Sequence, residues 1–205
     1  MAIAGKIAAV YVSDVDTTPV AFTDQATTPD AAYKRYQVTN PAYRYWPLGA
    51  TITVKKNSTI VTAGFTLERA GGYVVFDTAL APTDVVTVSG QALTLVQCGG
   101  FFNWSVDTDA ENADATTFAS GGWKEYVQTV KGWSGSAEAY WGDDRFFKSL
   151  GEIIVVKLFV DSGASQKCLE GFAMIRGEGV ETAVDDLVKE SIDFEGVGPL
   201  YFRLS

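Results

Sequence analysis

Apolar and polar positions alternate along most of the chain, and this pattern predicts β-strands. Short runs rich in β-branched and aromatic residues are bounded by turn residues, as is typical of half-buried strands. The run at 153–160 is almost wholly apolar, so we expect a central strand covered on both faces. A turn at 161–165 follows it. The other expected strands are residues 6–12, 51–54, 73–76, 85–89, 92–98, 131–141, 167–176, 188–194 and 200–204.

One segment, residues 143–150, has the pattern of a helix. Its two leading acids lie where the helix dipole favours negative charge, with Gly142 or Asp143 as the cap. Gly151 would end it. An apolar stripe would pack on a sheet and consists of Phe146, Phe147 and Leu150. A second helical turn near 184–188 is a weaker expectation.

Two polar stretches interrupt the strand pattern and are expected to be loops, at 23–32 and 107–122. The second is long and consists mainly of small and acidic residues. A loop of that length inside a compact domain is usually functional or disordered, and in an oligomer it can lie on a neighbour. Many short strands with one short helix predict a mainly β fold, a sandwich or barrel.

Charge is distributed unevenly between the two halves of the chain. The 205 residues carry a net charge of −9. Residues 1–100 hold seven acids and seven bases, which cancel, so the whole excess lies in 101–205. An acidic surface disfavours gripping of nucleic acid, which needs Lys and Arg against phosphates. It suits a channel wall along which DNA slides, and equally a solvated face that maintains solubility.

Composition bounds the class of protein further. Hydrophobic residues make up 47% of the chain, enough to bury a core without disulfides. Cys98 and Cys168 lie in apolar, strand-like runs and are expected to be buried thiols, with a disulfide between them left open. The N-terminus lacks the apolar stretch of a signal peptide, and no run reaches the roughly 20 apolar residues of a membrane helix. We therefore expect a soluble protein made in a cytoplasm.

Catalytic motifs are missing from the sequence. The chain has no histidine, which excludes a Ser-His-Asp triad and any site with a His ligand. No phosphate-binding GxxxxGK[ST] loop occurs. The acid pairs Asp143/Asp144 and Asp185/Asp186 are adjacent in sequence, whereas glycosidase carboxylates flank a bond from opposite sides. The chain is thus expected to be neither an enzyme nor a cofactor protein.

Four acids in the 107–122 segment superficially resemble a calcium loop. Asn112 takes the sixth position, where the EF-hand needs Gly, and Phe118 takes the twelfth, where it needs Glu. A solvated acidic loop is the better interpretation, and no metal site is expected.

Tryptophans are concentrated in one region, at positions 104, 123, 133 and 141. A sandwich core would account for them. Trp123, however, lies between Gly121-Gly122 and Lys124-Glu125, where the chain should be exposed, and exposed aromatics often anchor interfaces. Trp123 is equally compatible with a core position and a subunit contact.

Several segments resemble major tail proteins of long, non-contractile-tailed phages. The strongest are TTFASGGWKEYV at 116–127 and GWSGSAE at 132–138. The similarity extends to GKIAAVYV at 5–12, LEGFA at 169–173, ETAVDDLV at 181–188 and SIDFEGVG at 191–198. It covers about residues 1–45 and 92–205. The intervening residues, about 46–91, are interpreted as a β-rich insertion in a single tail-tube domain spanning 1–205.

The resemblance implies a β-sandwich with a flanking helix whose copies close into hexameric rings. Stacked rings would form an acidic-lined channel for DNA passage during ejection. The implied partners are further copies of the chain, the tape measure protein, the tail terminator and the distal tail proteins. Double-stranded DNA would pass without specific binding, and no membrane would be involved. The location would be the virion, after synthesis in the bacterial host cytoplasm.

On this interpretation the acidic segment crosses onto a neighbouring subunit. The expected interface residues are Phe118, Gly121, Gly122, Trp123 and Tyr126. The expected residues of the acidic loop or channel lining are Asp107, Asp109, Glu111 and Asp114. Two alternatives stay open. One is a β-sandwich binding module for a receptor or carbohydrate, with the tryptophans as sugar platforms. The other is the inner-tube protein of a contractile tail-like device.

Overall fold

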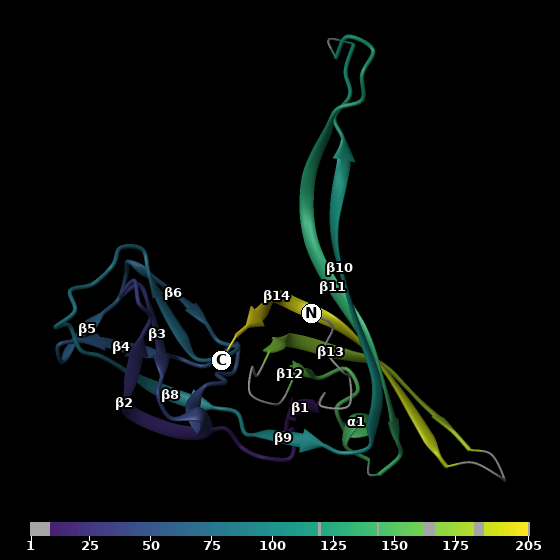
Figure 1. Ribbon diagram of the computed structural model, residues 1–205, viewed down its shortest axis with the longest axis horizontal. Helices are drawn as coiled ribbons and strands as arrows, with labels where there is room; N and C mark the ends of the chain where they lie inside the picture. The colour runs from purple at the N-terminus through teal and green to yellow at the C-terminus, as the bar shows by residue number, and fades with distance from the viewer. Residues whose placement is uncertain (1–8, 119, 143, 162–166, 183–186, 205) are drawn as a thin grey trace. The chain divides into compact units, whose positions relative to one another are not determined.

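The computed structural model describes residues 9–118, 120–142, 144–161, 167–182 and 187–204 (Figure 1). It is mainly β, with 62% of residues in strands and 4% in helix, arranged in two antiparallel sheets with one short α-helix. The mainly β prediction is confirmed. The chain divides into two compact units. Unit 1 comprises 1–98, 155–170 and 201–205, and unit 2 comprises 99–154 and 171–200.

One sheet lies wholly in unit 1 and has the strand order β5-β4-β8-β2-β3-β7-β6. Trp46, which is fully buried, is at its core, and its indole N–H donates to the Tyr43 carbonyl (2.7 Å). Valines on neighbouring strands pack around it. The strands are β2 (Val20–Pro29), β3 (Arg35–Val38), β4 (Thr53–Lys56), β5 (Thr59–Val61), β6 (Phe65–Glu68), β7 (Tyr73–Phe76) and β8 (Val86–Ala92). The sheet thus draws on residues before the segment interpreted as an insertion.

The other sheet has the order β10-β11-β14-β13-β12-β1-β9. In unit 1, β1 lies between β12 and β9, with Val10 opposite Leu158 on one side and Cys98 on the other. Residues 154–156 of β12 are all buried, which confirms the expected central strand. The strands are β1 (Ala9–Ser13), β9 (Leu95–Cys98), β10 (Phe101–Asp114), β11 (Tyr126–Tyr140), β12 (Ile153–Asp161), β13 (Lys167–Glu181) and β14 (Lys189–Arg203).

The predicted loop at 23–32 is wrong over most of its length, because β2 continues to Pro29. The strand accommodates its polar residues through a bulge between Phe22 and Gln25. At the bulge, Asp24 adopts a positive φ of 48° and its carboxylate accepts a hydrogen bond from Lys55 Nζ (2.9 Å). A polar sequence therefore forms a strand where local side-chain contacts fix the irregular backbone.

The predicted helix is shorter than expected, since α1 spans only Arg145–Lys148. Phe146 is buried and packs edge-on against Phe101, with ring centroids 5.8 Å apart. Phe147 and Leu150 are exposed, so the expected three-residue stripe is wrong. The cap prediction is also wrong: Asp144 is the N-cap and forms no side-chain capping bond. Gly151, at φ +80°, follows the helix as expected.

Other expectations concern the C-terminal part of the chain. The strands predicted at 188–194 and 200–204 are one continuous strand, β14. The expected turn at 161–165 and helical turn at 184–188 fall mostly outside the described residues. Both cysteines are thiols; Cys168 is buried and Cys98 half-buried. Burial raises the pKa of Cys168 to about 11, so it is protonated and unreactive at neutral pH.

Unit 1 contains a buried ionic cluster centred on Glu170. Arg203 Nε donates to Glu170 Oε1 (2.8 Å), and Tyr45 OH donates to Glu170 Oε2 (2.9 Å). Arg203 also pairs with Glu68 (2.8 Å) and donates to the Ala70 carbonyl (3.0 Å). Burial alone would lower the pKa of Arg203, but the hydrogen bond and charge of Glu170 raise it. The end of β14 is therefore tied to β13 and β6 by compensated buried charges.

Arg203→Met tests this cluster. The substitution keeps the apolar stem but leaves the Glu170 carboxylate, whose side chain is 3% exposed, without its main counter-charge. We expect a loss of about 3–5 kcal/mol in the free energy of unfolding, measured by urea denaturation. The matched control is Arg176→Met, which breaks the exposed Arg176–Glu195 pair and should cost less than about 1 kcal/mol. Equal effects of the two substitutions would contradict a structural role for the buried cluster.

Candidate functional site

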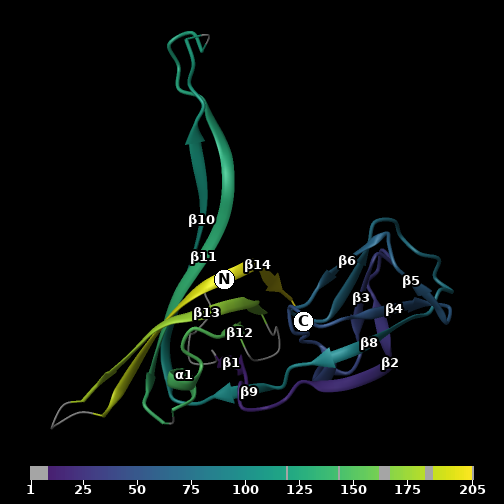
Figure 2. The same ribbon diagram turned by 180° about the vertical axis from the view of Figure 1, so that it is seen from behind.

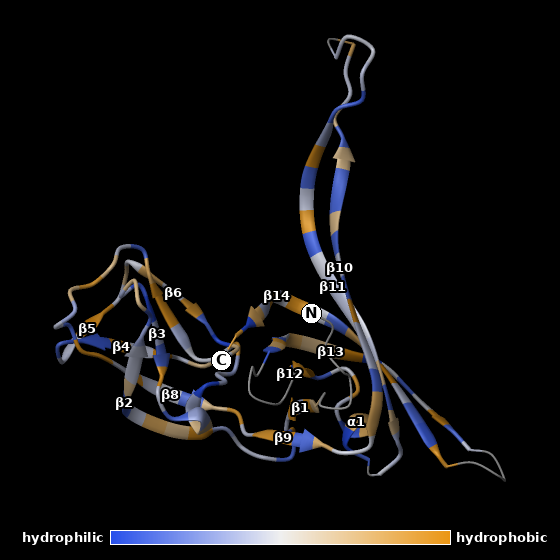
Figure 3. Cartoon of the chain, viewed as in Figure 1, coloured by the Kyte–Doolittle hydropathy of each residue, from blue (hydrophilic) through white to orange (hydrophobic). Residues whose placement is uncertain are grey.

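A long β-hairpin formed by β10 and β11 belongs to unit 2 and projects beyond its pairing with β14 (Figures 1 and 2). The two strands pair from Phe101 opposite Ala139 to Asp114 opposite Tyr126. β14 accompanies β11 only along Ser134–Tyr140. Beyond that point the hairpin is a two-stranded ribbon, so the prediction of a loop over 107–122 is wrong for its first eight residues. Figure 3 shows this ribbon as mostly polar, with isolated apolar positions.

The three strands β10, β11 and β14 present two faces of opposite character. Residues directly opposite each other on antiparallel strands share a face. On one face, Trp133, Ala137 and Ala139 of β11 are buried together with Ile192 and Phe194 of β14. The opposite face is solvent-exposed or half-buried and consists of Asn103, Ser105, Asp107, Asp109, Ser134, Ser136, Glu138, Ser191, Asp193 and Glu195. We call these ten residues the acidic face.

Three cross-strand rows build the acidic face. Asp107 lies opposite Ser134, which lies opposite Glu195. Ser105, Ser136 and Asp193 form the next row, with Ser105 Oγ and Ser136 Oγ 3.0 Å apart. In the third row, Asn103 Nδ2 donates to Glu138 Oε2 (3.0 Å), and Ser191 lies opposite Glu138. Short hydroxyl side chains thus separate the carboxylates, which lowers their mutual repulsion.

Arg176 of β13 borders the acidic face. Its guanidinium forms an ion pair with Glu195. It lines a shallow hollow together with Asp107, Asp193 and both serines of the middle row. The positive charge of Arg176 is therefore already paired within the chain.

The structure separates the four expected acidic residues. Asp107 and Asp109 lie on the acidic face, and Glu111 lines a hollow with Asp109 and Glu195. Asp114 lies instead at the outer end of the ribbon, where it accepts a hydrogen bond from the Thr116 backbone N–H (2.9 Å). Hydrogen bonds from the Thr116 hydroxyl and backbone lower the pKa of Asp114, so it stays ionised at neutral pH.

Sequence reasoning missed Glu138, Asp193 and Glu195 of the acidic face. They lie far from the 107–122 segment in sequence and join it only through strand register. The usable signal was the alternation of exposed polar and buried apolar residues at 134–139 and 191–195.

Residues 115–118 and 120–125 form a small hydrogen-bonded cap on the ribbon, which we call the tip. The Ala115 N–H donates to the Glu125 carbonyl (2.8 Å), and the Trp123 N–H donates to the Ser120 carbonyl (3.1 Å). Gly121 and Gly122 have φ values of +63° and +86°, which side chains with a Cβ rarely adopt, so the glycines are needed for this turn. The tip is thus a defined structure.

The tip displays the expected interface residues to solvent. Phe118 is fully exposed, Trp123 is 80% exposed and Tyr126, at the start of β11, is 58% exposed. The structure therefore excludes the core interpretation of Trp123. Among the described residues, two neighbouring positions on β11, Val127 and Val130, are also exposed apolar side chains.

Trp133 occupies the place where β14 diverges from β11. Its indole N–H donates to the Gly198 carbonyl (3.0 Å), and its ring packs edge-on against Phe194. A Cβ at Gly196 would lie 2.2 Å from Trp133 Nε1, and one at Gly171 would lie 2.8 Å from the ring. These two glycines therefore make room for the tryptophan.

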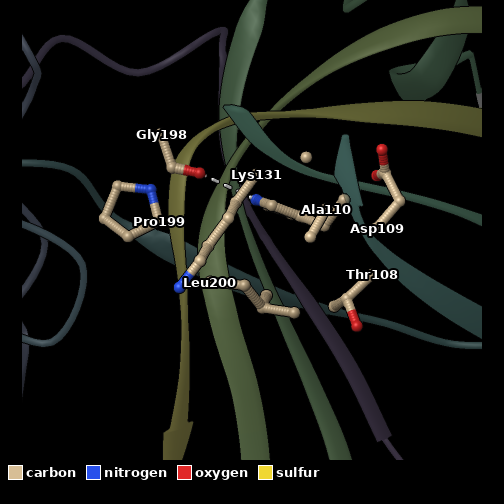
Figure 4. Close-up of a pocket in the computed structure, with 9 residues that line it drawn as sticks. Thr108, Asp109, Ala110, Lys131, Gly198, Pro199 and Leu200 are labelled. Atoms are coloured by element: carbon tan, nitrogen blue, oxygen red, sulfur yellow. Dashed lines mark hydrogen bonds between the residues drawn. The ribbon is translucent and has the colours of Figure 1, made fainter. Parts of the chain in front are cut away.

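Beside Trp133 the divergence leaves a hollow of about 560 Å³ (Figure 4). The hollow opens on the face opposite the acidic face, since Thr108, Ala110 and Lys131 share the side of Trp133. Its lining residues are Thr108, Asp109, Ala110, Lys131, Gly132, Trp133, Gly198, Pro199 and Leu200. Hence it combines apolar lining with one positive side chain, Lys131, whereas the Asp109 carboxylate lies over Gly132 on the acidic face.

The described part of the chain contains no group of three or more Cys, Asp or Glu side chains that could hold a metal ion. Its helices include none long and apolar enough to cross a membrane.

Comparison with known proteins gives limited similarity. No family model matches the chain, and no curated protein matches it. A chain in the tail of an empty gene transfer agent particle, determined by helical refinement with C6 symmetry, is 19% identical, with a TM-score of 0.44 over 54% of this chain and 87% of that one. A chain in the virion of a native gene transfer agent particle is also 19% identical, with a TM-score of 0.44 over 53% of this chain and 88% of that one. Function must therefore be argued from this chain's own residues.

Gly196→Ala tests the packing of Trp133. The new methyl group would displace the indole and overpack the junction, which we expect to cost about 1–3 kcal/mol in the free energy of unfolding. Gly177→Ala is the control, because a Cβ there would be 3.7 Å or more from its neighbours. Chemical denaturation of both variants distinguishes steric overpacking from the general effect of adding a methyl group to a strand.

Proposed function

We propose that this chain is a structural subunit of a phage tail tube, with its acidic face lining the channel. Copies would close into hexameric rings, and the rings would stack into a tube through which DNA passes during ejection. The observation that supports this best is the combination, in one three-stranded surface, of an exposed carboxylate-and-serine face with a projecting hairpin.

The acidic face has the chemistry of a surface along which DNA slides. Protein–DNA affinity derives mainly from cations that replace the counterions of phosphates. In the three cross-strand rows the ionised groups are all carboxylates, namely Asp107, Glu138, Asp193 and Glu195. The neighbouring Arg176 is neutralised by Glu195. Such a wall repels the phosphate backbone of DNA and binds no particular base sequence, as passage of a whole genome requires.

The hairpin indicates that the chain associates with further copies. A two-stranded ribbon in water is marginally stable on its own. β10 is an edge strand of 14 residues, and a long unpaired edge is a template for another chain. Phe118 and Trp123 at the tip expose large apolar surfaces of the kind that anchor interfaces. Assembly would stabilise the ribbon, pair the free edge of β10 and cover the aromatic side chains of the tip.

The proposal also follows from the resemblance of residues 116–127 and 132–138 to major tail proteins. On the structure, these two segments form the tip and the part of β11 that carries Trp133. In a tail, the tape measure protein, tail terminator and distal tail proteins would be the further partners, and the protein would be located in the virion.

Negative-stain electron microscopy of the purified protein tests the assembly. We expect hollow tubes or stacked rings to appear as concentration rises, without ligand or partner, because the ribbon edge and tip supply the contacts. Trp123→Ala should shorten the tubes or raise the concentration needed to form them. Monomers or closed trimers at every concentration would contradict the proposal, and a closed trimer would instead support the receptor-binding alternative.

Charge reversal on the acidic face tests its contact with DNA. Tubes of an Asp107→Lys/Asp193→Lys variant should retain linear double-stranded DNA in co-sedimentation, and the retained amount should fall steeply with salt as counterion release requires. Asp77→Lys/Glu152→Lys is the control, because it changes the net charge equally at exposed positions outside the acidic face. Equal retention by both variants would mean that the acidic face does not contact DNA.

A further inference from the structure

The hollow beside Trp133 has no occupant from its own hairpin tip. Ala110 lines the hollow, and the tip begins five residues further along β10. At about 3.3 Å per residue, the part of the tip around Thr117 is roughly 20 Å away along the strands. Any tip that enters the hollow must therefore belong to another copy of the chain.

The hollow and the tip are complementary in apolar surface. Leu200, Pro199 and the stem of Lys131 border the hollow (Figure 4), and Trp133 also lines it. The tip offers the Trp123 indole, 80% exposed on a turn held by its own hydrogen bonds. A tryptophan side chain has only two side-chain torsions, and the turn that carries it is already ordered, so docking costs little conformational freedom.

They are also complementary in charge. The hollow carries Lys131, and the tip carries Glu125 two residues after Trp123. Among the described residues, Lys131 has no ion-pair partner within the chain. A docked tip would place the Glu125 carboxylate against the Lys131 ammonium group, which favours one orientation of the tip.

The area available is adequate for a specific contact. A buried aromatic side chain removes roughly 150–250 Å² from water, so Phe118 and Trp123 together offer about 400 Å². Tyr126, Val127 and Val130 extend the same end of the hairpin. The total approaches the roughly 800 Å² per partner of a standard interface.

We infer that the tip of one copy docks in the hollow of a second copy, with Trp123 in the hollow and Glu125 paired with Lys131. Because tip and hollow are different surfaces of the same chain, the contact is heterologous and propagates from copy to copy. This inference rests on the proposed tail-tube function and specifies which surfaces make a contact between its subunits.

A charge-swap cycle tests the pairing. Lys131→Glu and Glu125→Lys, each alone, should raise the concentration at which tubes form by at least about tenfold, because each places like charges together. The double variant Lys131→Glu/Glu125→Lys should restore assembly to near the wild-type concentration. Lys34→Glu, a reversal at an exposed lysine of unit 1, is the control and should have little effect.

The outcomes separate this inference from the proposed function. If the wild-type chain forms tubes and the single variants form them equally well, the docking is wrong while the tail-tube proposal stands. If the double variant assembles no better than the single ones, the pairing is also wrong. If the wild-type chain forms no tubes, the proposed function itself fails.

Cross-linking provides a second measurement that does not depend on the strength of the charge pair. Glu125→Cys/Lys131→Cys protein, assembled and then oxidised, should give a ladder of covalent multimers on a non-reducing gel. Each single cysteine variant should give no such ladder, which controls for Cys98 and Cys168. Absence of the ladder from assembled double-cysteine protein would overturn the docking.

Discussion

The register of β11 against β10 and β14 determines most of what unit 2 can do. Because side chains alternate between faces, a shift of one residue would exchange the acidic face for the apolar one. The register is fixed by steric fits on the apolar side. Trp133 requires the bare backbone of Gly196, and Phe194 requires that of Gly135, where a Cβ would lie 2.5 Å from its ring. The exposed carboxylates have no packing of their own, so their arrangement depends on these buried contacts.

The same tryptophan accounts for where the hairpin leaves the sheet. Pairing of β11 with β14 ends at Ser134 opposite Glu195, so Trp133, the next residue toward the tip, is unpaired with β14. The indole lies over Gly196 and bonds to Gly198, so β14 turns aside while β10 and β11 continue together. One large side chain thus produces both the free ribbon and the hollow beside it. These two features are the surfaces that the proposed assembly uses.

Sequence patterns predicted the strands whose two faces differ in polarity or are both buried. The apolar run at 153–160 matched β12, and residues 73–76 matched β7. The sequence patterns failed where strands are solvated on both faces, as in β2 around Asp24 and β10 beyond Asp107. Such strands lack the regular alternation of apolar and polar residues by which a strand is recognised. The glycine neighbours of Trp123 correctly indicated that it is exposed, and its role as a subunit contact stays a prediction. Asp193 and Glu195 could not be joined to Asp107 without knowing the register.

Charge and association oppose each other in the proposed tube. Closing copies of the acidic face around one channel would bring carboxylates of neighbouring subunits together, which costs free energy at any spacing shorter than a Debye length. That cost must be offset by subunit contacts remote from the channel, which bury apolar surface and pair opposite charges. In the hairpin, the carboxylates of the acidic face lie on one side of the strands, and the exposed aromatic side chains of Phe118 and Trp123 lie at the far end of the ribbon. The channel wall of such a tube can repel DNA, because the contacts that hold the subunits together lie away from the channel.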